Sequence, residues 1–206
     1  MKGKFITFEG GEGSGKSTQT QIICELLKDK NIAHVTTREP GGTKISEAIR
    51  ALVLDAKNDK MSLETEILLF AASRAQLIDE FILPSLDEGK IVICDRYIDS
   101  SMVYQGMCNG NNIDKVLSAN SYAVNNCMPD LTLYFDIDPE LAFSRKNGAD
   151  VNDRMEMKGM EFHKKVRQGF LNLASMYPER IKVIDASKSI EEVTSQIVDT
   201  LREKGI

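Results

Sequence analysis

Residues 6–18 read ITFEGGEGSGKST, in which an apolar, β-branched run leads into the pattern G-x-x-x-x-G-K-S. Helix-forming residues follow directly, at 19–28. A strand, a glycine-rich loop and a helix in this order are the context in which the pattern binds phosphate, whereas a glycine-rich turn without a ligand needs neither flank. The segment therefore predicts a phosphate-binding loop (P-loop) at the end of a first strand.

The residue types inside this loop suit phosphate binding. Gly10, Gly13 and Gly15 permit backbone angles that turn consecutive N–H groups inward as an anion nest. A helix that begins near Lys16 adds its free N–H groups and the positive end of its dipole. The Lys16 ammonium can reach the β- and γ-phosphates, and the Ser17 hydroxyl can ligate Mg²⁺. The residues predicted to bind the nucleoside triphosphate are Gly10, Gly11, Glu12, Gly13, Ser14, Gly15, Lys16, Ser17 and Thr18.

Strand and helix patterns alternate along the rest of the chain. Fully apolar runs, as at 91–94, are typical of strands buried on both faces of a parallel sheet. No Pro/Gly/Ser-rich linker divides the 206 residues, so we expect a single domain over 1–206. The alternation predicts an α/β fold: a three-layer, doubly wound, five-stranded parallel sheet of the P-loop NTPase type with a short lid. The expected strands are 4–9, 33–38, 91–94, 131–135 and 181–184, and the expected helices are 15–30, 44–54, 63–86, 114–125, 159–176 and 190–203.

The composition argues against several classes of protein. A formal net charge of −5 disfavours non-specific binding to nucleic acid or to an anionic membrane, because both need a basic surface. No apolar run approaches the ~20 residues that span a bilayer, and the N-terminus enters a strand directly, without the pattern of a signal peptide. Four cysteines without C-x-x-C spacing are expected to be reduced structural thiols. We therefore expect a cytoplasmic protein with no nucleic-acid or membrane partner.

An acidic and a basic residue follow the third predicted strand. Asp95 ends this strand beside the P-loop, in the form of a Walker B element that holds Mg²⁺ directly or through water. Arg96 suits a residue that spans donor and acceptor phosphates, because guanidinium binds phosphate in a bidentate way. A surface ion pair is the alternative for this dipeptide taken alone. Asp136 ends another apolar strand, but Asp138 reads as a helix N-cap, and we interpret both as structural.

The class of P-loop protein follows from what surrounds the loop. Regulatory GTPases read guanine with N-K-x-D and sense the γ-phosphate with D-x-x-G, and neither pattern occurs in this sequence. The chain is also short for a motor or an oligomeric ATPase module. A small kinase remains, which must hold two anionic substrates together and exclude water.

Seven segments make this reading more specific. They are FEGGEGSGKST (8–18), TREPGGT (37–43), LFAASRAQ (69–76), DRY (95–97), SS (100–101), YQG (104–106) and PDLTLYFD (129–136). Through them the chain resembles the thymidylate kinases over essentially its whole length. The resemblance implies transfer of the γ-phosphoryl group of ATP to dTMP, giving dTDP and ADP in dTTP synthesis, with Mg²⁺ as cofactor and a homodimer as the assembly.

The resemblance also implies contacts with the nucleoside of dTMP. Phe70 would stack on the thymine ring; the alternative, an ordinary core residue of an amphipathic helix, is disfavoured by Arg74 one turn further along the same face. Arg74 would donate to a thymine carbonyl, and Gln105 and Ser101 would complete the base contacts. Tyr104 would crowd the sugar 2′ position and so favour deoxyribose.

The family resemblance also implies roles for charged residues. Arg38 and Arg96 resemble the grips on the acceptor phosphate, and Glu12 resembles the carboxylate near the acceptor 3′-hydroxyl. A carboxylate beside a phosphate nest is repelled unless it has its own partner, which favours a functional explanation for Glu12. Lys16, Arg96 and Glu12 are therefore predicted to be catalytic.

The lid, approximately residues 145–156, must supply a further cation, because the P-loop has no basic residue before its lysine. Arg145 is the predicted catalytic residue that meets charge in the transition state, with Lys146 as the reserve. Arg154 can equally anchor the lid to its own helix. A solvated helix end is the alternative for the first two residues.

In-line transfer to a phosphate dianion needs no protein nucleophile, because catalysis rests on positioning and charge stabilisation. His34 and His163 are therefore expected to be structural. Two other functions stay open at this point: a P-loop kinase for another nucleoside monophosphate, and a P-loop switch or binding NTPase.

Overall fold

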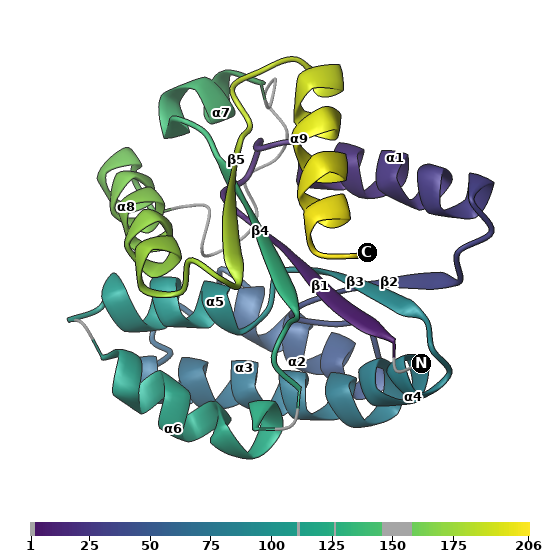
Figure 1. Cartoon of the computed structure of the whole chain (residues 1–206). Coiled ribbons are helices and arrows are strands. Elements are labelled where there is room, and N and C mark those ends of the chain that lie inside the picture. Colours follow the sequence, from purple (N-terminus) through teal and green to yellow (C-terminus); the bar gives the residue numbers. More distant parts are fainter. Residues whose placement is uncertain (1–2, 111, 126, 146–157) are drawn as a thin grey trace.

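The computed structural model describes residues 3–110, 112–125, 127–145 and 158–206. Its strands form a five-stranded, all-parallel sheet in the order β2-β3-β1-β4-β5 (Figure 1). The first strand lies in the middle and the chain winds outward on both sides of it, which confirms the doubly wound α/β sheet predicted from the sequence. The strands are β1 Lys4–Glu9, β2 His34–Arg38, β3 Ile91–Asp95, β4 Leu131–Asp136 and β5 Ile181–Asp185.

Helical segments connect the strands. The side-chain oxygens of Thr43, Ser62 and Ser189 each accept a hydrogen bond from a backbone N–H in the first turn of the helix that follows, which satisfies a donor that has no partner within the helix. The segments are α1 Lys16–Asp29, α2 Lys44–Leu54, α3 Leu63–Leu77, the π-helical η1 Ile78–Ile82, α4 Leu83–Asp87, α5 Ile98–Ser101, the π-helical η2 Met102–Met107, α6 Ile113–Val124, α7 Pro139–Arg145, α8 Met160–Met176 and α9 Ile190–Glu203.

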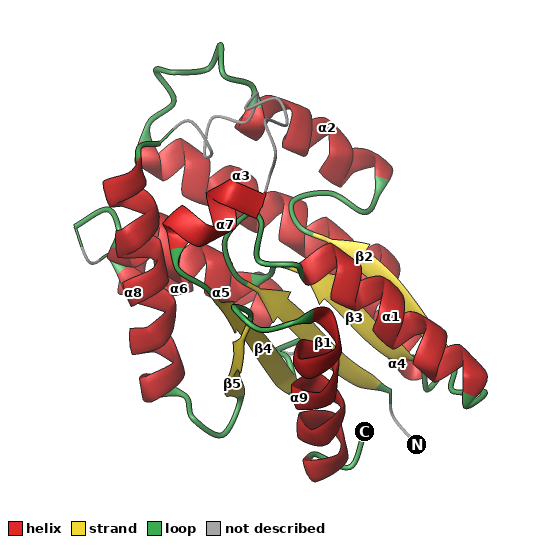
Figure 2. Cartoon of the chain, turned by 90° about the horizontal axis from the view of Figure 1, so that it is seen from above, coloured by secondary structure: helices red, strands yellow, loops and turns green. Residues whose placement is uncertain are grey.

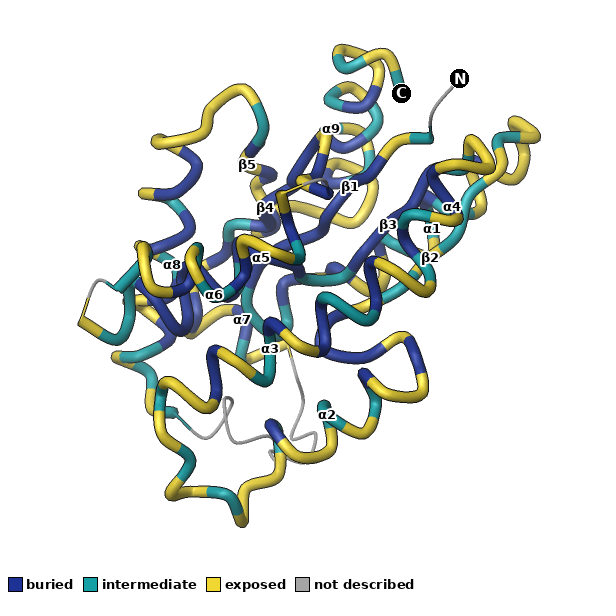
Figure 3. Tube along the Cα trace, turned by 90° about the horizontal axis from the view of Figure 1, so that it is seen from below, coloured by how far each residue is buried: buried dark blue, intermediate teal, exposed yellow. Residues whose placement is uncertain are grey.

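The two faces of the sheet carry separate apolar cores. Side chains alternate along a strand, so Phe5 of β1 packs into one cluster while Ile6 and Phe8 pack into the other. Helices α1 and α9 cover the second cluster, and α3, α6 and α8 cover the first (Figure 1). The central strands are buried on both sides between these layers (Figure 3), which explains their continuous apolar sequence.

Two helical regions differ from the prediction. The expected helix at 63–86 is interrupted by η1, directly before α4, which contains Pro84. Proline has no N–H to give to the carbonyl of Glu80 and its ring crowds that group, so the regular α-helical ladder cannot continue there. Segments α5 and η2, at 98–107, were not predicted, because serine, valine, tyrosine and glycine are weak helix formers. Their side chains are mostly buried, so tertiary packing stabilises these turns.

The structure also bears on the predictions for two aspartates, for the cysteines and for membrane-spanning helices. Asp138 Oδ1 accepts a hydrogen bond from Glu140 N at 2.9 Å, which confirms the predicted cap of α7. Asp136 and Asp138 both pair with Arg167, in keeping with structural roles. All four cysteines are free thiols. Within the described ranges, none of the helices combines the length and the apolar character that a membrane crossing requires.

Candidate active site

The P-loop, residues 10–15, leaves the carboxyl end of β1 and enters α1. Gly10, Gly13 and Gly15 have φ values of 146°, 74° and 88°, which confirms the backbone conformation predicted for them. A Cβ on Gly13 would overlap the carbonyl oxygen of Ala142 in α7, whereas one on Gly15 would have no heavy atom within 4 Å. The loop is therefore packed tightly against α7 at its centre and is open at the start of α1.

Lys16 closes over this loop. Its side chain is almost fully buried, and Nζ donates to the carbonyl oxygens of Gly10 and Gly11, at 3.0 Å each. Burial lowers the pKa of the ammonium, as does the nearby positive charge of Arg96. Ser17 and Thr18 are exposed in the first turn of α1, which has no acidic residue to offset the helix dipole. The loop thus brings the Lys16 ammonium and the first turn of α1 together at one place, and binding of an anion there stays a prediction.

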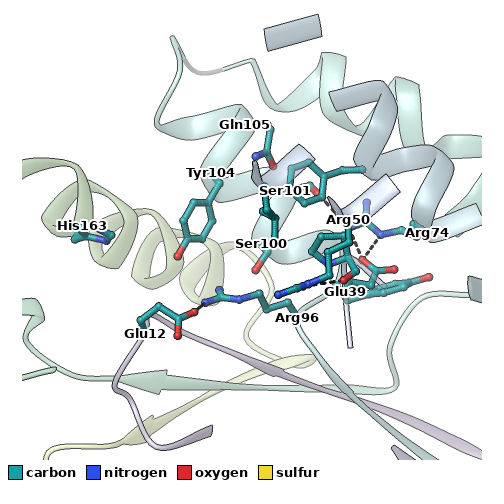
Figure 4. Close-up of a pocket in the computed structure, with 14 residues that line it drawn as sticks. Glu12, Glu39, Arg50, Arg74, Arg96, Ser100, Ser101, Tyr104, Gln105 and His163 are labelled. Atoms are coloured by element: carbon teal, nitrogen blue, oxygen red, sulfur yellow. Dashed lines mark hydrogen bonds and ion pairs between the residues drawn. The ribbon is translucent and has the colours of Figure 1, made fainter. Parts of the chain in front are cut away.

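A pocket with about 670 Å³ of empty space, part of it open solvent, lies beside the P-loop and is lined by residues of α2, α3, α5, η2 and α8. Helices α2 and α3 lie at the end of the sheet away from the N-terminus (Figure 2). Six of the seven residues predicted to bind the acceptor line the pocket, together with Glu12, which was predicted for the acceptor sugar (Figure 4). The six are Phe70, Arg74, Arg96, Ser101, Tyr104 and Gln105.

Arg74 is held rigidly at the base of the pocket. Its Nε and Nη2 donate to Glu39 Oε2 at 2.8 and 2.6 Å, and Nη2 also donates to Ser101 Oγ at 3.1 Å (Figure 4). Its Nη1 donates to Asn120 Oδ1, and Asn120 Nδ2 in turn donates to Val116 O, which fixes the amide orientation. Guanidinium has five N–H donors, so these four bonds leave one Nη1 hydrogen for a ligand.

Glu39, the partner of Arg74, was not singled out in the sequence. Burial raises its pKa to about 7, against the opposing effect of the guanidinium. Its second oxygen, Oε1, is buried and accepts no hydrogen bond within the described part of the chain. Gln105, above the pair, donates from Nε2 to Glu66 Oε1 at 2.7 Å, so this amide is fixed as well. The wall that was predicted to read a base is therefore preorganised by its own hydrogen bonds.

Arg96 joins the pocket to the P-loop. Its Nη2 lies 2.5 Å from Glu12 Oε1, and its guanidinium carbon lies 5.7 Å from the centre of the Tyr104 ring (Figure 4). Burial by itself lowers the pKa of the Arg96 guanidinium, but the neighbouring Tyr104, Glu12 and Asp95 raise this pKa well above its usual value. Glu12 thus has the cationic partner that a carboxylate beside a phosphate nest needs. Arg96 Nη1 is buried and makes no hydrogen bond to the residues that the structure describes.

Asp95 and Ser17 were predicted to hold a metal ion. Asp95 is the last residue of β3, and its Oδ1 is buried and makes no hydrogen bond in the described ranges. No group of three or more His, Cys, Asp or Glu side chains suited to a metal is present in those ranges. Mg²⁺ bound with a nucleotide needs only one or two protein oxygens besides phosphates and water, so a free carboxylate oxygen and a hydroxyl fit it.

Two predicted cations lie outside the pocket. Arg38 is at the end of β2 opposite Asp95 in the sheet, but its half-exposed guanidinium donates to both oxygens of Glu47, at 2.9 and 3.0 Å. Arg145 ends α7 and donates to the carbonyl oxygens of Ala186 and Ser187, at 2.8 and 2.9 Å. Most of the predicted lid, with Lys146 and Arg154, falls outside the described residues. The catalytic role of Arg145 and the phosphate contact of Arg38 stay predictions.

Several site residues were missed. Glu9, the last residue of β1, is fully buried, and burial together with Asp99 raises its pKa to about 8. Its signal was visible: a carboxylate at the end of an apolar strand, directly before the P-loop. Arg50 lines the pocket and donates to Pro40 O at 2.8 Å, but a basic residue on an amphipathic helix carries no such signal. His163, expected to be structural, also lines the pocket.

Comparison with known proteins agrees with this geometry. The model of the thymidylate kinase family matches residues 8–197. The chain is 46% identical to the thymidylate kinase of Clostridium novyi, over 98% of this chain and 99% of that protein, and 48% identical to that of Ligilactobacillus salivarius, over 98% and 97%. The crystal structure of thymidylate kinase from Ehrlichia chaffeensis superposes with a TM-score of 0.77 at 34% identity, covering 98% of this chain and 99% of that one. The chain belongs to the thymidylate kinase family.

Proposed function

We propose that this chain transfers the γ-phosphoryl group of ATP to dTMP, producing ADP and dTDP for dTTP synthesis, within one kinase domain whose lid lies at approximately 145–156. The observation that carries the proposal is the contact between Glu12 and Arg96. It joins a P-loop to a pocket whose lining includes the aromatic rings of Phe70 and Tyr104 and the amide of Gln105, side chains that suit a nucleoside. Relatives that match nearly the full length carry the name thymidylate kinase.

The donor phosphates would bind in the P-loop. Its backbone N–H groups and the first turn of α1 would attract an anion, and Lys16 is already beside the loop carbonyls. Asp95 and Ser17 would hold Mg²⁺ together with the phosphates; the bound ion would neutralise charge between the β- and γ-phosphates. Release of the Lys16 ammonium from two carbonyl oxygens to a phosphate exchanges neutral acceptors for a charged one, which strengthens its hydrogen bonds.

The acceptor would bind in the pocket. Phe70 offers an aromatic surface to a flat base, and Arg74, held by Glu39 and Asn120, has one hydrogen to give to a carbonyl. Tyr104, fixed between Arg96 and the aromatic rings of α8, supplies the bulk that would disfavour a 2′-hydroxyl. A thymine carbonyl and a deoxyribose suit this arrangement.

Transfer itself would rest on positioning. The acceptor phosphate is the nucleophile, so no side chain has to form a covalent bond or remove a proton from it. Arg96 lies between the two substrates, and its buried Nη1 is available for a phosphate oxygen. Arg145 or another cation of the lid would complete the charge around the transferring group.

A panel of nucleotides tests the acceptor. We expect the purified chain, assayed by coupled detection of ADP, to turn over dTMP faster than dUMP, UMP, dCMP or dGMP. UMP is the sharpest comparison, because it carries a 2′-hydroxyl and lacks the thymine methyl group. Faster turnover of UMP or dCMP than of dTMP would replace the proposal with a kinase for that nucleotide.

We further propose that the protein is a cytoplasmic homodimer, as the family resemblance implies. Sedimentation equilibrium over a range of protein concentrations tests the assembly. A mass close to twice 23.0 kDa is expected, and a single species at 23.0 kDa at all concentrations would rule the dimer out.

A further inference from the structure

Glu9 lies between the P-loop and the wall of the acceptor pocket. It is 0% exposed, and Gly10 of the P-loop follows it directly. Its Oε1 accepts hydrogen bonds from Tyr97 N at 2.8 Å and Ser100 N at 3.1 Å, and its Oε2 accepts one from Ser100 Oγ at 2.6 Å. The carboxylate therefore binds both ends of the four-residue segment that follows Arg96.

This segment determines where Arg96 points. Arg96 has a φ of 66°, a left-handed conformation that is unfavourable for a non-glycine residue. Such a conformation persists only where neighbouring contacts hold it. On one side Arg96 N donates to Phe8 O at 2.9 Å; on the other, Tyr97 N donates to Glu9. Two consecutive residues of β1 thus hold the backbone on both sides of the Arg96 side chain.

The far side of the segment has a separate anchor. Asp99, also fully buried, accepts from Arg180 Nη1 and Nη2 at 2.6 and 2.7 Å and from Thr132 Oγ1 at 2.9 Å. This anchor joins α5 to β4 and to the start of β5. Glu9 is the carboxylate that joins the same segment to the P-loop strand.

We propose that Glu9 is a positioning residue that acts through Arg96: its carboxylate fixes residues 97–100 and so keeps the Arg96 guanidinium between the donor and acceptor phosphates. The proposal rests on the proposed phosphoryl transfer. The position of the acceptor atoms carries this role, because the three groups that contact Glu9 are all hydrogen-bond donors of the segment, and a neutral oxygen can accept from them as well.

Two conservative variants separate geometry from charge. Glu9→Gln is neutral at every pH but keeps an oxygen that can accept from both backbone N–H groups, while its amide donates to Ser100 Oγ, which can rotate to accept. Glu9→Asp keeps an ionisable carboxyl group but withdraws it by about 1.5 Å, the length of one C–C bond, so it cannot reach both N–H groups.

The expected order of turnover follows. Glu9→Gln should keep kcat within about threefold of the wild type, and Glu9→Asp should lower kcat by about 100-fold, the scale of a misplacement of roughly 1 Å at a reacting centre. The KM for ATP should change little in both, because the P-loop itself is intact. Asp136→Asn is the matched control: it changes a carboxylate at the end of the neighbouring strand that pairs with Arg167, and its kcat should match the wild type below its melting temperature.

A double-variant cycle tests whether Glu9 acts through Arg96. If it does, Glu9→Asp combined with Arg96→Ala should have the kcat of Arg96→Ala alone, within about twofold. Losses that multiply would overturn the proposal, as would a Glu9→Asp variant at least as active as Glu9→Gln. If Glu9→Asp does not fold, Ser100→Ala takes its place in the cycle. The loss of kcat caused by Ser100→Ala must then vanish in the Arg96→Ala background, and a loss that persists there overturns the proposal.

All variants are assayed with the acceptor nucleotide that the wild type uses best. A failure of dTMP as substrate is therefore seen separately, in the wild-type panel.

Discussion

Gly13→Ala should destabilise the protein much more than Gly15→Ala, although both residues are in the P-loop. At Gly13, φ is 74°, and leaving glycine in this region costs about 1–2 kcal/mol. The added Cβ would also overlap the carbonyl of Ala142, and relief of such a clash by backbone movement costs about 1–3 kcal/mol more. The expected total is about 2–5 kcal/mol of unfolding free energy. At Gly15, with φ of 88° and open space around the Cβ, only the conformational cost of about 1–2 kcal/mol remains.

Equilibrium unfolding in urea, with the same slope assumed for all three proteins, measures both values. Gly13→Ala should also lower kcat, since relief of the overlap moves α7, the helix that ends at Arg145. Gly15→Ala should leave α7 in place, and its main effect on activity should be a higher KM for ATP. Equal destabilisation by the two variants would refute the packing of the P-loop on α7 as described here.

Substitutions at three further residues test their individual roles. Lys16→Ala should lower kcat by roughly 100-fold or more with little change in melting temperature, because it removes a charge from the transferring phosphates; activity within a few-fold of the wild type would reject the P-loop assignment. Tyr104→Phe should keep discrimination between dTMP and ribo-TMP while Tyr104→Ala relaxes it; equal discrimination by both variants and the wild type would remove Tyr104 from the sugar site. Arg145→Ala should lower kcat strongly with little change in the KM for dTMP, and Arg145→Lys should restore kcat only in part. A larger loss of kcat in Lys146→Ala or Arg154→Ala than in Arg145→Ala would assign the catalytic role to that residue instead.

The fold was largely predictable because its signals are local. Buried parallel strands need continuous apolar residues, and helices on their faces need a period near 3.6, so the order of elements could be read from the sequence. The segment at 98–107 was missed for the opposite reason. Its helical turns are held by burial against both α6 and α8, and no local pattern reports such contacts.

The site was predictable where a motif names a residue, and not where a partner lies far along the chain. Phe70, Arg74 and Gln105 meet in one pocket as expected. Glu39, 35 residues before Arg74, completes the buried ion pair, and Glu9, 88 residues before Tyr97, holds the segment after Arg96. Such pairings depend on how the strands are ordered in the sheet, which the spacing within a motif does not encode.

The stoichiometry of phosphoryl transfer tests the account most directly. Purified protein is mixed with ATP, Mg²⁺ and dTMP, and ³¹P NMR follows ATP, ADP, dTDP and inorganic phosphate in the same sample. The account predicts one dTDP formed for each ADP, with almost no inorganic phosphate, because the acceptor in the pocket and not water receives the γ-phosphoryl group. Formation of ADP with an equal amount of inorganic phosphate and no dTDP would contradict it and identify a P-loop hydrolase instead.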